Sequence, residues 1–319
     1  MHLLLVGNYG VGNLGDEALK SYFLQAFPEI RWTVLSANPV EPYELPRLPF
    51  GLRSLFSLGW LRTLRALRRS DGVVFGGGSL FTDVESVKAC WLWWWHVRIA
   101  RFFGKPCYLA SQGIGPFSTR MGERLAKDAV RLSSFLSVRD TTSAGRVRSW
   151  GMRTEVIQTF DPVLSLLKAE KVGVRSNSVF VLIPRRNTTP SFLSAVRKAM
   201  EDSGSSSARV LLLQPDDPAE RSVAETIIQE LPGAIVKEAR TLRDLSDGVA
   251  DASLVLAQRY HGALAALALG VPLRIVGQGA GDKLSELEAT QRALAGQGID
   301  PRAAIETGES ALRAVLASR

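Results

Sequence analysis

The sequence has 319 residues, of which 46% are hydrophobic, so it can bury sizeable cores and is neither a disordered nor a fibrous chain. At about 150 residues per domain, this length predicts two domains. The chain carries 39 Lys and Arg against 31 Asp and Glu, and the resulting net charge of +8 favours anionic partners. The two cysteines, Cys90 and Cys107, exclude a disulfide framework.

Short apolar segments alternate with amphipathic segments from the N-terminus onward, which is typical of parallel α/β sheets. The strands expected in the first half are His2–Val6, Thr33–Leu35, Gly72–Phe75, Cys107–Ala110, Phe135–Val138 and Glu155–Ile157. The helices expected there are Leu14–Phe27, Leu61–Arg68, Ser86–Phe103, Arg120–Leu132 and Thr141–Trp150.

The polar stretch Lys168–Asn177 is expected to be a linker, and a second series of elements follows it. Its expected strands are Val179–Ile183, Arg209–Leu213, Ala234–Val236, Leu254–Leu256 and Leu273–Val276. Its expected helices are Ser191–Asp202, Ala219–Leu231, Leu242–Val249, Gly262–Leu269 and Ala303–Leu316. We therefore predict two doubly wound, Rossmann-like domains, residues 1–170 and 178–319, which face each other across a cleft. Ligands of such sheets bind beyond the carboxyl ends of the strands.

The loop after the first strand is rich in glycine. Gly10, Gly12 and Gly15 match the G-x-G-x-x-G pattern of dinucleotide-binding loops. The acidic residue expected at the end of the second strand is absent, however, and Asp16 would repel a pyrophosphate. The glycines are therefore expected to let a ligand approach the backbone. Asn13 and Asp16 either contact that ligand or stabilise the following helix. In the second case Asn13 is the N-cap, and the negative charge of Asp16 lies at the positive end of the helix dipole.

Small residues follow the next strands as well. Gly76, Gly77 and Gly78 come after Gly72–Phe75, where they either line the cleft with backbone N–H groups or form a tight turn. The other expected cleft residues at strand ends are Gln112, Gly113 and Asp161.

Taken in order, these motifs resemble the polysaccharide pyruvyl transferase family, above all its bacterial cell-wall members, which ketalate a glycan that anchors surface-layer proteins. The resemblance runs from residue 3 to about residue 290. It is carried by Gly7–Glu17, Gly76–Ser79, Gln112–Pro116, Ser137–Asp140, Asp161-Pro162, Arg259–His261 and Gly270–Pro272.

The resemblance implies a glycosyltransferase-B-like fold and phosphoenolpyruvate as the donor. It implies as acceptor a sugar with two suitably placed hydroxyls, on a cell-wall glycan, an exopolysaccharide or a lipid-linked precursor. The first domain would bind the acceptor. The second would bind the donor through Arg259, Tyr260 and either Arg185 or Arg186. Two departures are Pro184 before Arg185, and Tyr260 where an aliphatic residue is usual. No cofactor is implied.

The chemistry of ketal formation fits these residues. Bidentate arginines suit the phosphate and the carboxylate of the donor. The vinyl methylene also needs a general acid, for which we expect His261, two residues after Arg259. Asp16 and Asp161 are expected to orient the acceptor hydroxyls. If His261 only caps a helix, then Asp16, Asp161 or Tyr9 must supply the proton.

Two other functions remain open at this point. A nucleotide-sugar glycosyltransferase of the same architecture needs a ribose-binding acid near the last strands, and Gly277–Gly281 offers none before Asp282. A non-catalytic anion- or glycan-binding protein is the third possibility. Three scattered histidines and two cysteines predict no metal site, and no nucleic-acid-binding motif accompanies the positive charge.

Two segments could contact a membrane. The expected helix Ser86–Phe103 contains four tryptophans and is apolar on all sides, so it is either a core helix or a lipid interface. Residues 45–70 contain six arginines and no Asp or Glu, interleaved with Phe50, Phe56 and Trp60. They form either a solvated face or a contact with anionic lipid. The N-terminus carries no secretory signal, so we expect a cytoplasmic protein that can reach the inner face of the membrane.

Overall fold

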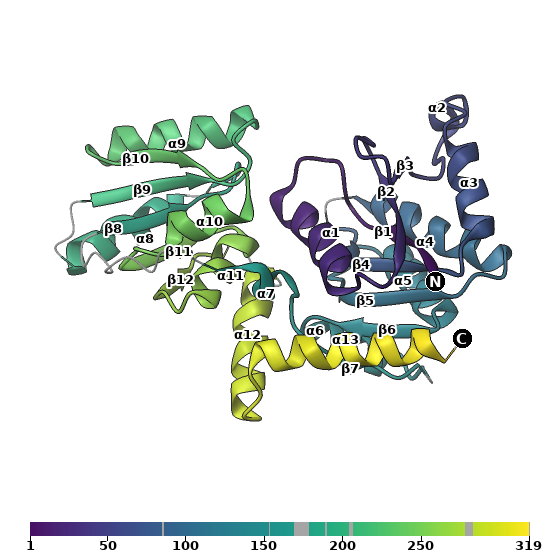
Figure 1. The fold of residues 1–319 in the computed structure, drawn as a ribbon. Helices are drawn as coiled ribbons and strands as arrows, with labels where there is room; N and C mark the ends of the chain where they lie inside the picture. The colour runs from purple at the N-terminus through teal and green to yellow at the C-terminus, as the bar shows by residue number, and fades with distance from the viewer. Residues whose placement is uncertain are drawn as a thin grey trace. The chain divides into compact units, whose positions relative to one another are not determined.

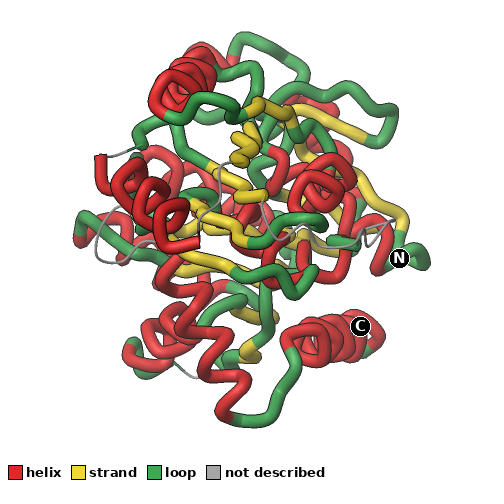
Figure 2. Tube along the Cα trace, turned by 90° about the vertical axis from the view of Figure 1, so that its left-hand side faces the viewer, coloured by secondary structure: helices red, strands yellow, loops and turns green. Residues whose placement is uncertain are grey.

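The computed structural model describes residues 1–84, 86–152, 154–168, 179–188, 190–203, 207–277 and 283–318. The chain divides into two compact units. The first consists of Met1–Gly12, Asp16–Pro162 and Thr290–Arg319, and the second of Asn13–Gly15 and Val163–Ala289. Helices, strands and loops alternate along the trace (Figure 2). Each unit contains one parallel sheet, so the predicted α/β class is confirmed.

The first unit is built on a seven-stranded sheet in the order β3-β2-β1-β4-β5-β6-β7, a doubly wound arrangement that reverses direction after β1. Its strands are β1 (His2–Val6), β2 (Arg31–Ser36), β3 (Glu44–Pro46), β4 (Gly72–Phe81), β5 (Cys107–Ile114), β6 (Phe135–Val138) and β7 (Ile157–Gln158). Its helices are α1 (Leu14–Ala26), α2 (Leu52–Leu55), α3 (Trp60–Arg69), α4 (Val87–Phe102), α5 (Arg120–Leu132) and α6 (Thr141–Ser149).

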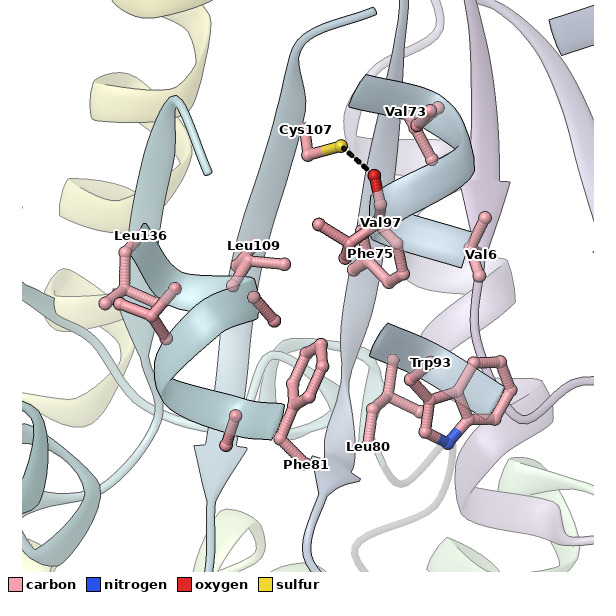
Figure 3. Packing of buried hydrophobic residues seen from close by; sticks show 14 of the residues in the cluster. Val6, Val73, Phe75, Leu80, Phe81, Trp93, Val97, Cys107, Leu109 and Leu136 are labelled. Carbon is pink, nitrogen blue, oxygen red and sulfur yellow. Dashed lines mark hydrogen bonds between the residues drawn. The ribbon is translucent and has the colours of Figure 1, made fainter. Parts of the chain in front are cut away.

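The central strands of this sheet are buried on both faces, which explains their continuous apolar sequences. Figure 3 shows Phe75 of the sheet beside Val97 of α4, and Leu80 of the sheet beside Trp93 of the same helix. The thiol of Cys107 lies 3.9 Å from the carbonyl oxygen of Val97 and points into the same core. This packed core holds the carboxyl ends of the strands in fixed positions.

The second unit has a five-stranded parallel sheet in the order β10-β9-β8-β11-β12. Its strands are β8 (Val179–Ile183), β9 (Ser207–Leu212), β10 (Ile235–Glu238), β11 (Leu254–Ala257) and β12 (Leu273–Ile275). Its helices are α7 (Val163–Leu166), α8 (Pro190–Ser203), α9 (Pro218–Glu230), α10 (Leu242–Val249) and α11 (Tyr260–Ala268), and α12 (Lys283–Gly296) runs from this unit into the first. The strand β8 lies between β9 and β11, so the reversal of direction again falls at the first strand of the sheet.

The C-terminal helix α13 (Pro301–Ala317) departs from the expected domain division, which assigned residues 178–319 to one domain. The structure groups it with the first unit, where it packs along β5, β6 and β7 (Figure 1). Thr159 Oγ1 donates a hydrogen bond of 2.9 Å to the Ala304 carbonyl, and the Tyr22 hydroxyl donates one of 2.5 Å to Glu309. The expected linker Lys168–Asn177 falls, apart from its first residue, outside the described residues.

Two strands run further than their apolar sequences predict. The strand β4 continues through the three glycines to Phe81, and β5 continues to Ile114. Gly77 and Gly78 have φ of 76° and 80°, and Ser111 has φ of 50°, so both strands are irregular where they pair. The glycine triplet is therefore part of an irregular strand, and the alternative of a tight turn after Phe75 is wrong.

The tryptophan-rich helix α4 belongs to the protein's own packing on most of its surface. Trp93 is buried in the core, and Trp94 Nε1 donates to Asp128 at 2.8 Å. Trp95 is 37% exposed and donates to the Pro49 carbonyl. Burial lowers the pKa of His96 to about 4, and its Nε2 accepts from the backbone of Leu48. In the described part of the chain, no helix is both long and apolar enough to cross a bilayer.

Candidate active site

The second unit brings two of the predicted arginines to neighbouring strand ends. Strands β8 and β11 are paired with Ile183 opposite Ala257, so Arg185 and Arg259 each follow their strand by two residues. Gln258 ties the two loops together, because its Oε1 accepts hydrogen bonds from the Arg185 backbone at 3.3 Å and from the Thr188 hydroxyl at 2.6 Å. These bonds fix the loop that carries Arg185 beside the start of α11.

The guanidinium of Arg259 is held from one side by the protein itself. Its Nη2 donates to Glu220, at the start of α9, and to Gln214 at 2.8 Å. Glu220 is fully buried and also accepts from the backbone N–H groups of Leu213 and Gln214, at 2.8 and 3.1 Å. This buried carboxylate therefore accepts from three donors at the end of β9, one guanidinium and two backbone N–H groups, and it holds the Arg259 side chain in place.

On its other side, the same guanidinium still has N–H groups that can donate to a ligand. A guanidinium carries five N–H donors, and Arg259 Nε is buried without a hydrogen-bond partner among the described residues. Burial, followed by the positive charge of Arg185 and also of Arg186, lowers the pKa of Arg259 to about 10, against the opposing charge of Asp217. The side chain still carries its charge at neutral pH. An unsatisfied buried donor costs about 1–3 kcal/mol, so an anionic ligand at this side would be stabilising.

The structure distinguishes the two arginines that follow β8. Arg185 is half-buried and exerts the larger effect on Arg259, whereas the Arg186 side chain is 59% exposed and lies 4.0 Å from Asp217. Arg185 is therefore better placed to act together with Arg259 on one anion.

Tyr260 and His261 occupy the first turn of α11, immediately after Arg259. Both are half-buried, and their rings meet edge to face with centroids 5.3 Å apart. The helix N-terminus adds a favourable dipole for an anion at this place. Tyr260, His261, Arg259 and Arg185 thus lie at one edge of the sheet of the second unit.

A second polar cluster lies at the carboxyl edge of the sheet in the first unit. Arg139, after β6, donates from Nη1 to Asp161 at 2.6 Å and from Nη2 to the Ser79 hydroxyl at 2.9 Å. Both members of the ion pair are buried. Gly113 leaves the necessary room, since a Cβ there would lie 2.6 Å from Ser79 Oγ and 3.3 Å from Arg139 Nε. Asp161 is therefore charge-compensated by Arg139.

Gln112 lies inside β5 and is completely buried. Its Nε2 donates to the carbonyls of Phe75 and Ala110 at 2.9 and 3.1 Å. Its Oε1 has no hydrogen-bond partner among the residues that the structure describes. The side chain ties the irregular ends of β4 and β5 together.

The first loop is shaped by its own polar side chains. Asn13 Oδ1 accepts from the Gly15 N–H at 3.0 Å, which is the capping role considered from the sequence. Asn8 Nδ2 donates to the Asp16 carboxylate at 3.0 Å, and a Cβ on Gly78 would lie 3.6 Å from that carboxylate. Asp16 and the glycine triplet are therefore neighbours. Gly10 and Gly12 have positive φ angles of 78° and 73°. The Gly76 carbonyl accepts a hydrogen bond from the Tyr9 hydroxyl.

Tyr9 and Arg47 have structural roles in this loop. The Tyr9 hydroxyl is buried and donates to the Gly76 carbonyl at 2.8 Å. Burial, with the nearby charges of Asp16 and Glu17, raises the pKa of Tyr9 well above its usual value, so it is a poor proton donor. Arg47 Nη2 donates to the carbonyls of Gly7 and Tyr9 at 3.1 and 2.9 Å. Among the described residues, no group of three His, Cys, Asp or Glu side chains could hold a metal ion.

A family model that matches most of the chain shows to which protein family the chain belongs. The family model described as polysaccharide pyruvyl transferase matches residues 13–279. The chain belongs to this family. The match includes Asp16, Arg139, Asp161, Arg185, Glu220 and Arg259–His261, so both polar clusters lie within the part that pyruvyl transferases share. No curated protein sequence matches the chain significantly.

Solved structures support the fold of this pyruvyl transferase family member. UDP-N-acetylglucosamine 2-epimerase from Rickettsia bellii is 12% identical with a TM-score of 0.63, covering 100% of this chain and 96% of its own. The Neisseria meningitidis UDP-GlcNAc 2-epimerase bound to UDP-GlcNAc is 12% identical with a TM-score of 0.59 and full coverage of both chains. Anabaena Alr3699/HepE in complex with UDP-glucose is 14% identical with a TM-score of 0.62, again over both whole chains. The likeness shows the glycosyltransferase-B-like fold that was predicted.

Several residues of the two clusters were not anticipated. Glu220, Gln214 and Gln258 hold Arg259 and the Arg185 loop, and Arg139 holds Asp161. Glu220 follows the helix start Asp217-Pro218, where an acidic residue is usually explained by the helix dipole. Its actual partner lies 39 residues away, so local sequence patterns carry no sign of it.

Proposed function

We propose that this protein transfers pyruvate as a ketal from phosphoenolpyruvate to a sugar of a cell-wall glycan or exopolysaccharide, and that phosphate is released. The observation that carries the proposal is Arg259, which is fixed on one side by Glu220 and whose buried Nε has no partner among the described residues. Together with Arg185 it offers two guanidinium groups to a small dianion. Membership of the pyruvyl transferase family supports the same donor.

The proposed reaction needs one proton delivered and two hydroxyl protons removed. His261 protonates C3 of the donor, which leaves positive charge at C2, and one sugar hydroxyl attacks C2 and loses its proton. The second hydroxyl then attacks C2 while the C2–O bond to phosphate breaks. Of the two hydroxyl protons, one returns to His261 and the other leaves on the phosphate. Arg185 and Arg259 stabilise the departing phosphate, since guanidinium groups bind phosphate in a bidentate manner.

The acceptor is assigned to the first unit. Asp16, half-buried and bound by Asn8, supplies a carboxylate that can accept hydrogen bonds from sugar hydroxyls. Asp161 is fully buried and paired with Arg139, so it would orient the acceptor through Arg139. We propose a glycan that anchors surface-layer proteins as the acceptor, on the strength of the resemblance to the cell-wall members of the family.

The experiment compares ligands by the thermal stabilisation that they cause. Phosphoenolpyruvate should raise the melting temperature, while UDP-glucose and UDP should not. Arg259→Ala should weaken binding of phosphoenolpyruvate by about 10- to 150-fold, which corresponds to the loss of one charge-assisted contact of about 1.5–3 kcal/mol. Arg221→Ala, on the exposed side of α9, is the control and should bind normally. Equal affinity of Arg259→Ala and the control would contradict the donor assignment.

A nucleotide-sugar transferase is the second candidate, because structural relatives of the same fold are complexes with UDP-glucose and UDP-GlcNAc. Stabilisation by UDP-glucose but not by phosphoenolpyruvate would favour it. The residues Gly277–Gly281 and Asp282, in which a ribose-binding acid was sought, lie outside the described residues except for Gly277. An increase in the mass of a glycan acceptor by one pyruvate ketal would exclude a protein that only binds glycans.

A further inference from the structure

Large apolar side chains are exposed along one segment of the first unit, between residues 50 and 61. Phe56 is 83% exposed and Leu58 is 66% exposed, and three more lie in the same segment. We call these five residues the apolar tip, and they are Phe50, Leu55, Phe56, Leu58 and Leu61. Single exposed apolar residues are normal, but a group of large ones marks an interaction surface.

The apolar tip is held in place by the segment's own hydrogen bonds. The backbone N–H of Phe50 donates to the Ser54 hydroxyl at 2.8 Å, and Trp60 Nε1 donates to the Leu55 carbonyl at 3.0 Å. The neighbouring helix α3 is anchored on its inner side by Thr63 and Leu67, which are buried. Figure 1 shows α2 and α3 at the outer margin of the first unit. The tip is therefore presented outward on an anchored support.

Positive charge lies directly beside the tip. We call Arg62, Arg65, Arg68 and Arg69 of α3 the basic face, and all four are exposed. None of them forms an ion pair with a carboxylate in the described part of the chain, and residues 45–70 contain no Asp or Glu. Arg47 is excluded from this face, because loop carbonyls hold it and its guanidinium lies 4.9 Å from the centre of the Trp93 ring.

We propose that the apolar tip and the basic face dock the protein on a bilayer that contains anionic lipid. Aromatic and aliphatic side chains, beside arginines that have no carboxylate partner among the described residues, suit the boundary between headgroups and acyl chains. Exposed arginines are attracted by the negative surface potential of anionic lipid, and each contributes about 1 kcal/mol, or about fivefold in partitioning. Docking on lipid does not depend on the proposed function. The purpose of docking, which would be to bring the protein to an acceptor carried on lipid, does rest on that function.

The experiment is flotation with vesicles of phosphatidylcholine alone and with vesicles that also contain phosphatidylglycerol, without donor or acceptor. We expect binding only to the anionic vesicles, weakening with salt, because exposed charges are screened over ~8 Å at 0.15 M. The triple variant R62Q/R65Q/R69Q should lower partitioning by about 100-fold, at about fivefold per arginine. The variant F56S/L58S should also lose binding, although it keeps every positive charge.

Two control variants make the same chemical changes elsewhere. R120Q/R124Q/R148Q removes three exposed arginines of α5 and α6, and V40S/I235S removes two exposed apolar side chains. Both should bind vesicles like the wild type. The proposal is overturned if the wild type fails to bind anionic vesicles at low salt, or if both control variants lose binding equally. If the wild type is a dimer, F56S/L58S is a monomer and neither protein binds lipid, then the apolar tip contacts a second copy of the chain and not a bilayer. Since no sugar or donor is present, none of these outcomes depends on pyruvyl transfer.

Discussion

Arg259 shows how one residue combines an expected role with an unexpected support. Its position after a strand and before His261 is visible in the sequence, and the structure puts it beside Arg185. Its orientation depends on Glu220, whose carboxylate is buried and also receives two backbone N–H groups. A buried carboxylate needs such partners, because an uncompensated charge in the interior costs several kcal/mol.

Glu220→Gln tests this support. The glutamine can still accept from the backbone of Leu213, but its NH₂ group faces the donors of Arg259, so the ion pair is replaced by a repulsive contact. We expect a loss of about 3 kcal/mol in the free energy of unfolding, as for a broken buried ion pair, and weaker binding of phosphoenolpyruvate. Urea unfolding and ligand titration measure both. Glu225→Gln, exposed on the same helix, should change neither, and a Glu220→Gln protein as stable as that control would contradict the role.

His261 is tested by a substitution that keeps a hydrogen-bonding side chain at the start of α11. His261→Asn cannot deliver a proton, so turnover should fall by about 10²- to 10⁴-fold while phosphoenolpyruvate still binds. Steady-state rates and ligand titration on the same folded protein separate the two effects. If the variant keeps most of its rate, the acid must be sought elsewhere, at Asp16 or Asp161, since the buried Tyr9 hydroxyl has a raised pKa.

At the scale of elements, the regular parts of the fold follow from periodicity and the irregular parts do not. The bounds of β1, β6, β8, α5 and α10 agree with the expected ranges, because each is a clean apolar or amphipathic run. The ends of β4 and β5 were placed too early, since glycine in a strand is usually a sign that the strand stops. The short elements β3, α2 and α7 and the helix α12 were not expected at all. In the first unit, the candidate residues Gly77, Gly78 and Gln112 lie where β4 and β5 become irregular. The sequence therefore located these candidates correctly but did not predict their conformation.

The glycine triplet gives a prediction at this scale. Gly77 has φ of 76°, and a Cβ there would lie 2.7 Å from the buried Leu19 side chain. Gly77→Ala should therefore cost at least about 1–2 kcal/mol, the penalty of a side chain in the left-handed region. Gly145→Ala is the matched control, because Gly145 lies in α6 with no atom close to its Cβ position.

Gly145→Ala should stabilise the protein by about 0.5–1 kcal/mol, as expected for alanine in a helix interior. Melting temperatures of the two variants should therefore move in opposite directions from that of the wild type. If Gly77→Ala melts at or above the wild-type temperature, the irregular strand geometry at β4 is wrong.

The chain forms the parallel sheet of the first unit and then that of the second, and residues Thr290–Arg319 return to the first unit. The two-domain plan and both strand series are readable from the sequence, since each sheet repeats the βα alternation. The return of Thr290–Arg319 to the first unit is not, because α13 has one apolar face and periodicity does not say which sheet it covers. Only contacts between distant residues, such as Thr159 with Ala304, decide it.

The placement of α13 can be tested by hydrogen exchange in a cavity-forming variant. Leu312 is 2% exposed, and Leu312→Ala should cost about 2–5 kcal/mol. The lost stability should appear as faster amide exchange in β5, β6 and β7, against which α13 packs, while β8 and β11 exchange as in the wild type. Leu245→Ala, at a fully buried position of α10, should give the reverse pattern, with faster exchange in the second unit alone. If Leu312→Ala instead accelerates exchange in β8 and β11, then α13 covers the second sheet. In that case residues 178–319 form one domain, as the sequence predicts.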